Sequence, residues 1–182
     1  TAIITAACND IHNDKSNKTV SLYYQSTDSL NNSNLTFAED VIRKLDKNVS
    51  KDSNVFYLNQ CLKGKLAISK NDTEEINKAR SILKDFLTRN SDRHNELLDV
   101  IRVEYNSIEG LYWIKYVGNA DSMFYYFQKA YKLAKKSKAI PTSTEINTIT
   151  NLAEAYKQTG RYDQAVIYYM EAAKKARTEK LN

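Results

Sequence analysis

The sequence INTITNLAEAYKQTG, residues 146–160, continues as RYDQAVIYYMEAAKKA, residues 161–176, and this stretch decides the fold. Before Gly160, the apolar residues Leu152, Ala153 and Tyr156 recur with helical spacing. After Gly160, a second apolar face recurs at intervals of three, seven and ten residues: Tyr162, Ala165, Tyr169 and Ala172. Glycine readily adopts the left-handed conformation that ends one helix and lets the chain reverse. The stretch therefore predicts a helical hairpin.

The order of large and small residues in this hairpin resembles that of one tetratricopeptide repeat (TPR). Eight positions support the resemblance: Leu152, Ala153, Tyr156, Gly160, Tyr162, Ala165, Tyr169 and Ala172. The resemblance implies a non-catalytic scaffold that binds a protein or peptide, and it does not identify that partner.

The apolar pattern of the hairpin's second helix occurs at three earlier places in the chain. The four copies are Leu35, Ala38, Ile42, Leu45; Ile76, Ala79, Leu83, Phe86; Ala120, Met123, Phe127, Ala130; and Tyr162, Ala165, Tyr169, Ala172. Their second positions are 41, 44 and 42 residues apart. This periodicity predicts an all-α chain of about eight helices in four hairpins. The period exceeds the about 34 residues of the usual repeat and resembles long-repeat members such as kinesin light chains and bacterial peptide receptors, which implies a right-handed α-solenoid.

Breaks in the apolar pattern locate the remaining helices. We expect helices at residues 19–30, 54–70, 92–117 and 121–138, with a further helix after each of the first two. Asp72 and Glu75 have the spacing of a capping box at the start of the fourth helix. We predict a polar tail or tether over residues 1–18 and a TPR-like repeat domain over residues 19–182, with the resemblance strongest over 104–176.

The two ends of the sequence support a second hypothesis. No polar capping helix follows the last predicted helix, although repeat arrays normally need one. Residues 1–8, TAIITAAC, resemble the end of a bacterial lipoprotein signal in which Cys8 would be lipidated. These features are typical of a sensory or regulatory domain cut from a longer, exported and membrane-associated signalling protein. Thr5 departs from the leucine usual in such signals, so an ordinary chain end and a cytoplasmic location stay open.

Composition excludes several classes of protein. Four glycines and one proline are too few for the turns of an all-β fold. With 42% hydrophobic and 27% charged residues, the chain is typical of folded proteins and not of disordered ones. Its net charge of +5 resides in residues 111–182, which contain 12 Lys and Arg against 6 Asp and Glu. A basic region can attract an acidic partner, although a solvated outer helix face explains it equally.

By the TPR resemblance, the first helix of each hairpin lines the concave side of the array. The predicted peptide-binding stripe comprises Asn147, Asn151, Glu154 and Gln158 on the seventh helix, and Tyr105, Glu109, Tyr112 and Tyr116 at the equivalent positions of the fifth. Tyrosine offers contact area together with a hydroxyl group, which suits peptide recognition. The alternatives are that these are ordinary surface positions, or that a neighbouring repeat covers them.

The sequence offers no candidate for catalysis, a cofactor or a metal. His12 and His94 lie in unrelated segments without cysteine or carboxylate partners at metal-ligand spacing. There is no phosphate-binding glycine loop and no nucleophile elbow. Cys61 lies among apolar residues and is predicted to be buried. We expect neither enzymatic activity nor nucleic-acid binding, although the basic sixth and eighth helices keep the latter as a weaker alternative.

Overall fold

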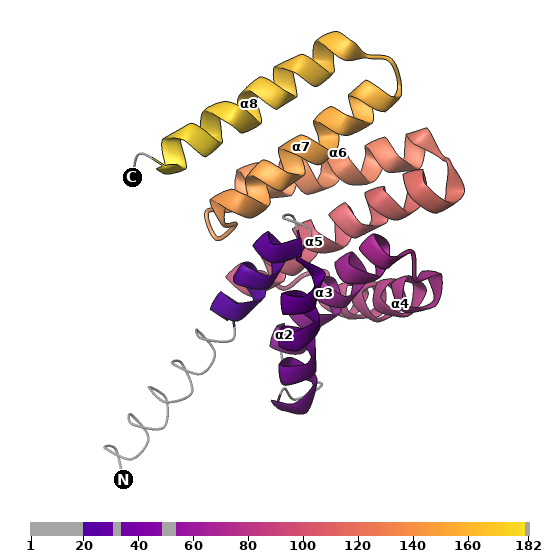
Figure 1. The fold of residues 1–182 in the computed structure, drawn as a ribbon, viewed down its shortest axis with the longest axis vertical. Coiled ribbons are helices and arrows are strands. Elements are labelled where there is room, and N and C mark those ends of the chain that lie inside the picture. Colours follow the sequence, from indigo (N-terminus) through magenta and orange to yellow (C-terminus); the bar gives the residue numbers. More distant parts are fainter. Residues whose placement is uncertain (1–19, 31–33, 49–53, 181–182) are drawn as a thin grey trace. The chain divides into compact units, whose positions relative to one another are not determined.

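The computed structural model describes residues 20–30, 34–48 and 54–180, and no strand occurs among them (Figure 1). Residues 20–30 are helical, and the following elements are α2 (Leu35–Asn48), α3 (Asn54–Lys70), α4 (Thr73–Arg89), α5 (Glu96–Tyr112), the π-helical turn η1 (Trp113–Val117), α6 (Ala120–Lys136), α7 (Thr142–Gln158) and α8 (Tyr162–Lys180). The predicted all-α helical-repeat class is confirmed. The tail at residues 1–18, including Cys8, lies outside the described residues.

The fifth helix begins four residues later than predicted. Asn95 is its N-cap, because its backbone is extended and its side chain accepts a hydrogen bond from the Leu98 N–H at 2.8 Å. Asp92 instead accepts a hydrogen bond from the Ser91 hydroxyl within the preceding connection. At the other end, η1 continues the helix to Val117, and Gly118 ends it with a φ of 73°. Gly160 has the same left-handed conformation, with a φ of 76°.

Only one of the two hydrogen bonds of the predicted capping box forms at the start of α4. The Glu75 N–H donates to the Asp72 carboxylate at 3.1 Å, as expected for a cap. The Asp72 N–H, however, donates to the carbonyl of Ala67 at the end of α3, and Asn71 has a φ of 60°. The end of α3 therefore uses the amide that the Glu75 side chain would otherwise bind.

The chain divides into two compact units, residues 1–79 and 80–182, and each is taken by itself. In the first unit α2 packs on α3, whose residues Leu58, Cys61 and Leu62 are fully buried. Asp46 of α2 accepts a hydrogen bond from Asn59 and pairs with Lys63, both at 2.9 Å. Cys61 is buried as predicted. The single repeat domain over residues 19–182 stays a prediction.

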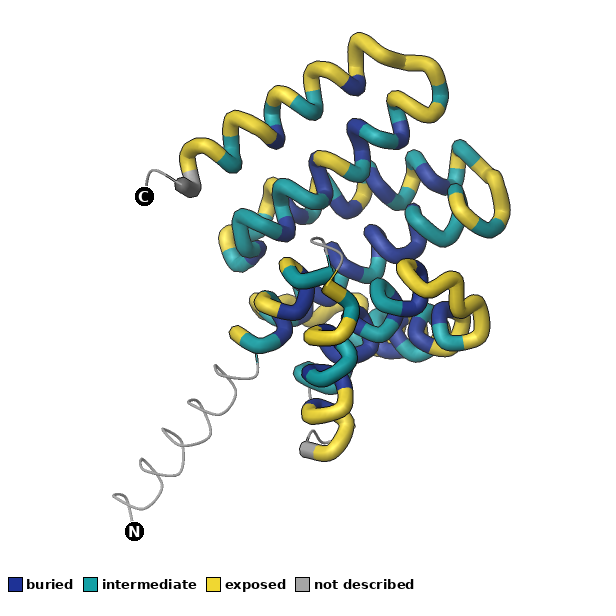
Figure 2. The backbone as a smooth tube through the Cα atoms, in the orientation of Figure 1, coloured by how far each residue is buried: buried dark blue, intermediate teal, exposed yellow. Residues whose placement is uncertain are grey.

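In the second unit α5 packs on α6, α6 on α7, and α7 on α8, and Figure 1 shows these four helices following one another in a row. A cluster of Met123, Phe127, Leu152 and Ala155 forms the core between α6 and α7. Figure 2 shows buried positions recurring along each of these helices, with exposed ones between them. Most positions of the repeated second-helix pattern are buried, but Tyr162 at the start of α8 is 66% exposed.

Aromatic rings join the last three helices. Phe124 of α6 lies 5.0 Å from Tyr156 of α7, measured between ring centroids. Tyr156 stacks on Tyr168 of α8 at 5.3 Å, and Tyr168 contacts Tyr131 of α6 edge-on at 5.6 Å. Such pairs add to the free energy gained from burial alone. Tyr156, one of the residues on which the TPR resemblance rests, thus packs against the core between α6 and α7.

Gly110 of α5 allows α6 to approach closely. It occupies the position equivalent to Leu152 of α7, 42 residues later in the sequence. A Cβ atom at Gly110 would lie 2.4 Å from two ring carbons of Phe127, which is only 3% exposed. The Phe127 ring therefore fills the space that a side chain at residue 110 would need.

We expect Gly110→Ala to destabilise the protein by about 1–3 kcal/mol, because the buried ring has little room to move. Helix propensity alone predicts the opposite, a gain of about 1 kcal/mol. Urea denaturation measures the change. In a Phe127→Leu background the same substitution should cost much less, and an equal cost in both backgrounds would contradict the proposed clash.

Candidate binding site

A pocket of about 730 Å³ lies within the second unit. Helix α5 forms its floor with Tyr105 and Asn106, α4 contributes Lys84 and Leu87, and α6 contributes Leu133. The connections that follow α4 and α6 complete its edge. We call this the cationic pocket, because several lysines line it.

Arg102 fixes the edge of the cationic pocket. Its Nη2 atom donates to the carbonyls of Asn90 and Arg93 in the connection before α5, at 2.9 and 2.6 Å. Its Nη1 atom pairs with Asp99 at 3.1 Å. The other Asp99 oxygen accepts a hydrogen bond from Ser137, after α6, at 3.0 Å. Arg102 and Asp99 therefore hold the two connections in place, and their charges are used in doing so.

The remaining charges around the pocket are positive. Four exposed lysines line it: Lys84, Lys129, Lys136 and Lys138. None of them forms an ion pair with a residue in the part of the chain that the structure describes. Asp99 is the only carboxylate in the lining, and it is already paired. The pocket therefore has an excess of positive charge that no described residue neutralises.

The floor of the pocket contains a buried acceptor. Asn106 is 2% exposed, and its Nδ2 atom donates to the Arg102 carbonyl at 2.6 Å. Its Oδ1 atom has no hydrogen-bond partner among the described residues. Beside it, burial and the nearby charge of Glu109 raise the pKa of Tyr105, so its hydroxyl remains a neutral donor. The floor thus contains a buried acceptor without a partner, Asn106 Oδ1, beside a tyrosine hydroxyl that interacts with Glu109.

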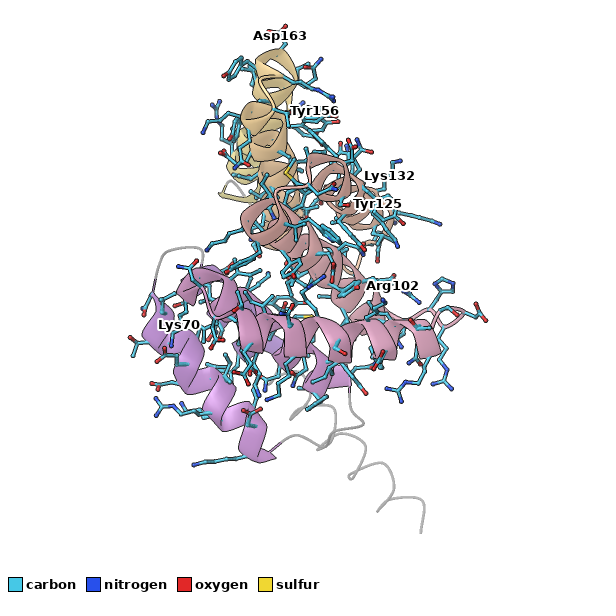
Figure 3. All side chains as sticks on the ribbon, turned by 90° about the vertical axis from the view of Figure 1, so that its right-hand side faces the viewer. Lys70, Arg102, Tyr125, Lys132, Tyr156 and Asp163 are labelled. Carbon is cyan, nitrogen blue, oxygen red and sulfur yellow. The ribbon has the colours of Figure 1, made fainter. Side chains whose placement is uncertain are left out.

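A second, shallower pocket of about 300 Å³ continues across the outer side of α6. It shares Lys129, Leu133 and Lys136 with the cationic pocket and adds Tyr125 and Lys132. Figure 3 shows Arg102, Tyr125 and Lys132 on the same side of this unit. The two pockets therefore form a continuous surface with both cationic and apolar groups.

In the α5 half of the predicted stripe, Glu109 and Tyr112 contact Arg80 of α4. Arg80 donates to both carboxylate oxygens of Glu109, at 2.8 Å each, and its guanidinium lies 3.4 Å from the centre of the Tyr112 ring. The Trp113 indole N–H donates to the same carboxylate at 3.2 Å. Burial opposes the charge of Arg80, yet Glu109 outweighs it and raises the pKa of Arg80. Glu109 is buried. At this position a neighbouring helix covers the predicted stripe, which is one of the alternatives that the sequence left open.

The α7 half of the stripe has different surroundings. Glu154 accepts hydrogen bonds from the Tyr169 hydroxyl of α8 and from Lys157. Asn147 and Asn151 are half-buried, and Gln158 is exposed. Tyr105 lines the cationic pocket instead. A binding role for the stripe, including the half-buried Tyr116, stays a prediction.

Part of the cationic pocket left a signal in the sequence. Lys129 and Lys136 of this pocket, with Lys132 of the adjoining one between them, follow in steps of three and four residues, which places all three on one face of the predicted sixth helix. No sequence pattern indicated the role of Asn106, because the residue type alone does not determine whether an asparagine within a helix is buried or exposed.

The described residues hold no group of three or more His, Cys, Asp or Glu side chains that could bind a metal ion. In the described ranges, no helix has the length and apolar character needed to cross a bilayer.

Removing the charge of Glu109 should destabilise the second unit. We expect Glu109→Gln to cost about 3 kcal/mol, because it leaves a largely buried guanidinium without its anion. Urea denaturation gives the free energy of unfolding. The matched control is Glu171→Gln, whose partner Lys135 is 49% exposed, and this change should cost less than about 1 kcal/mol. Equal costs would show that burial of the Arg80–Glu109 pair adds nothing.

The Glu154–Tyr169 contact should make stability depend on pH. The hydrogen bond from Tyr169 lowers the pKa of Glu154, so the contribution of Glu154 is present above about pH 4.3 and is lost as the pH falls. The same bond raises the pKa of Tyr169 to about 12, so its contribution is present below about pH 10 and is lost as the pH rises.

We therefore expect Tyr169→Phe to lower stability at pH 7 by up to about 1 kcal/mol, with a smaller loss below pH 4. Solvent screens the pair, because the Glu154 side chain is 41% exposed. Urea denaturation at the two pH values tests this. Tyr162→Phe makes the same chemical change at an exposed position and should have no effect at either pH. A pH-independent loss for Tyr169→Phe would contradict the assignment.

Comparison with known protein families gives a match to a tetratricopeptide repeat over residues 146–176. These are the residues of α7 and α8 in which the TPR pattern was recognised. Neither the curated proteins nor the solved structures contain a significant match. The repeat match over residues 146–176 and the all-helical, paired arrangement both fit a TPR-like repeat protein.

Proposed function

We propose that this protein is an interaction scaffold that binds an acidic, extended peptide segment of a partner protein in the cationic pocket. One observation supports this above others: four lysines without ion-pair partners surround a floor that contains a buried, unpartnered acceptor. TPR repeats are generally interaction modules, which agrees with a protein ligand.

The lysines would supply attraction and orientation. Lys84 and Lys129 lie on different helices, so carboxylates spaced along one peptide could pair with both walls of the pocket. Exposed ion pairs contribute little affinity each, but several of them raise the association rate and reject basic peptides. Salt should therefore weaken binding, because ions screen exposed charges.

Asn106 would recognise the peptide backbone. Its Oδ1 atom lacks a partner, and a buried acceptor without a hydrogen bond costs about 1–3 kcal/mol. A peptide N–H placed at this atom would remove that cost, which carboxylates alone cannot do. This favours a peptide over a simple anion.

Apolar contacts would complete the site. Leu87 and Leu133 line the cationic pocket, and Tyr125 is 58% exposed on the adjoining surface of α6. These groups can cover apolar side chains that alternate with the acidic ones. Arg102 already fixes the edge of the pocket, so less conformational entropy is lost on binding.

Fluorescence anisotropy with a labelled peptide of alternating glutamate and leucine tests the proposal. We expect saturable binding, weakened about tenfold or more by Lys129→Glu combined with Lys136→Glu. Lys47→Glu makes the same charge change on an exposed position of α2 and should have little effect. A lysine–leucine peptide should not bind.

Asn106→Leu separates backbone recognition from charge. This variant should bind the acidic peptide more weakly while its stability stays within about 1 kcal/mol, because it also removes an unpartnered buried acceptor. Equal binding of acidic and basic peptides, or unchanged affinity in the double lysine variant, would reject the site. Tighter binding of a single-stranded oligonucleotide of matched charge would instead indicate a nucleic-acid ligand.

A further inference from the structure

Helix α8 has two apolar faces. Its inner face contains Ala165, Tyr168 and Ala172, which pack toward α7 and α6. The outer face has four large exposed apolar residues: Tyr162 at 66%, Val166 at 54%, Ile167 at 61% and Met170 at 68%. A helix that is apolar on both sides is normally covered on both sides.

This concentration is specific to α8. Across the described residues, large exposed apolar side chains occur at seven positions, and the other three lie on separate elements: Phe37, Val117 and Tyr125. Single exposed apolar residues are ordinary, whereas a contiguous group indicates an interaction surface. The outer face of α8 is therefore a candidate interface, and it shares no residue with the cationic pocket.

The outer face has the spacing of a coiled-coil seam. Successive steps of three, four, three and four residues connect Asp163, Val166, Met170, Ala173 and Arg177, all of which are exposed. This is the heptad spacing that keeps one helix face toward a partner helix. The middle of the seam is apolar, and its two ends have opposite charges.

The charges at the ends of the seam select one orientation. If two α8 helices pack antiparallel about Met170, Asp163 of each copy lies opposite Arg177 of the other. Parallel packing would instead place like charges opposite each other. Neither side chain forms an ion pair with the described residues of its own chain. Figure 3 shows Asp163 at the tip of the unit, directed away from the other helices.

We propose that the outer face of α8 binds the same face of a second copy of this chain, in an antiparallel pair with its two-fold axis at Met170. A two-fold interface requires a surface that is complementary to itself, and the seam from Asp163 to Arg177 meets this requirement. The seam spans about 21 Å of helix, so the interface is small and the dimer reversible. The pair presents two cationic pockets, which would strengthen binding to a partner with two acidic segments.

Sedimentation equilibrium over a range of protein concentrations tests the pairing. We expect a monomer–dimer equilibrium in which Met170→Lys raises the dissociation constant about tenfold or more, because two like charges meet at the axis. Asp163→Lys and Arg177→Asp should each weaken the dimer, and the double variant should restore it by exchanging the two charges. Glu74→Lys, an exposed charge reversal on α4, should have no effect.

Oxidative cross-linking gives an independent readout. Met170→Cys in a Cys8→Ser background should form a disulfide-linked dimer at concentrations where the parent dimerises, because Cys61 is buried and the two introduced thiols meet at the axis. A protein that stays monomeric would overturn the proposal, as would a dimer unaffected by Met170→Lys. Failure of the double charge reversal to restore the dimer would overturn the antiparallel orientation. Dimerisation and peptide binding use separate residues, so each can fail without the other.

Discussion

The second unit depends on the fact that none of its helices can bury an apolar face alone. Helix α5 packs on α6, and α6 and α7 are each covered by the neighbours before and after them, with the core of Met123, Phe127 and Leu152 between α6 and α7. The contact between Gly110 and the Phe127 ring sets how closely α5 and α6 approach. Helix α8 follows the same rule on its inner face. On its outer face no helix of the described residues packs against it, and the seam around Met170 is exposed.

The same stacking determines where the charges go. Arg80 and Glu109 lie between successive helices and form a largely buried pair, closed by Trp113 and the Tyr112 ring. Arg102 is used in fixing the connections around α5. Among the lysines of α4 and α6, those that line the pocket, Lys84, Lys129 and Lys136, form no ion pair with a described residue, because their helices present them to solvent. The buried cation Arg80 therefore stabilises the stack, and the unpaired lysines of the pocket are the ones that the proposed acidic ligand would contact.

Sequence reasoning correctly predicted the helical-repeat scaffold, whereas the predicted binding stripe stays a prediction. The equivalence of α5 and α7 placed eight residues on one stripe, but their surroundings differ. Arg80 of α4 occupies the α5 half, and no described residue plays the same part for the α7 half, where Glu154 bonds to Tyr169 of α8 instead. Equivalent positions in a repeat share backbone geometry. They share an environment only where the neighbouring side chains also match.

By itself, the sequence determined the local structure of this protein. The apolar spacing fixed the helices, and Gly118 and Gly160 fixed two helix ends, because these effects depend on residues within one or two turns of each other. The match over residues 146–176 rests on the same short-range pattern. Only the tertiary structure decided which polar residues face a pocket. The exposure of Asn106, Glu109 or Lys129 depends on side chains from other helices, and no spacing within one helix specifies those.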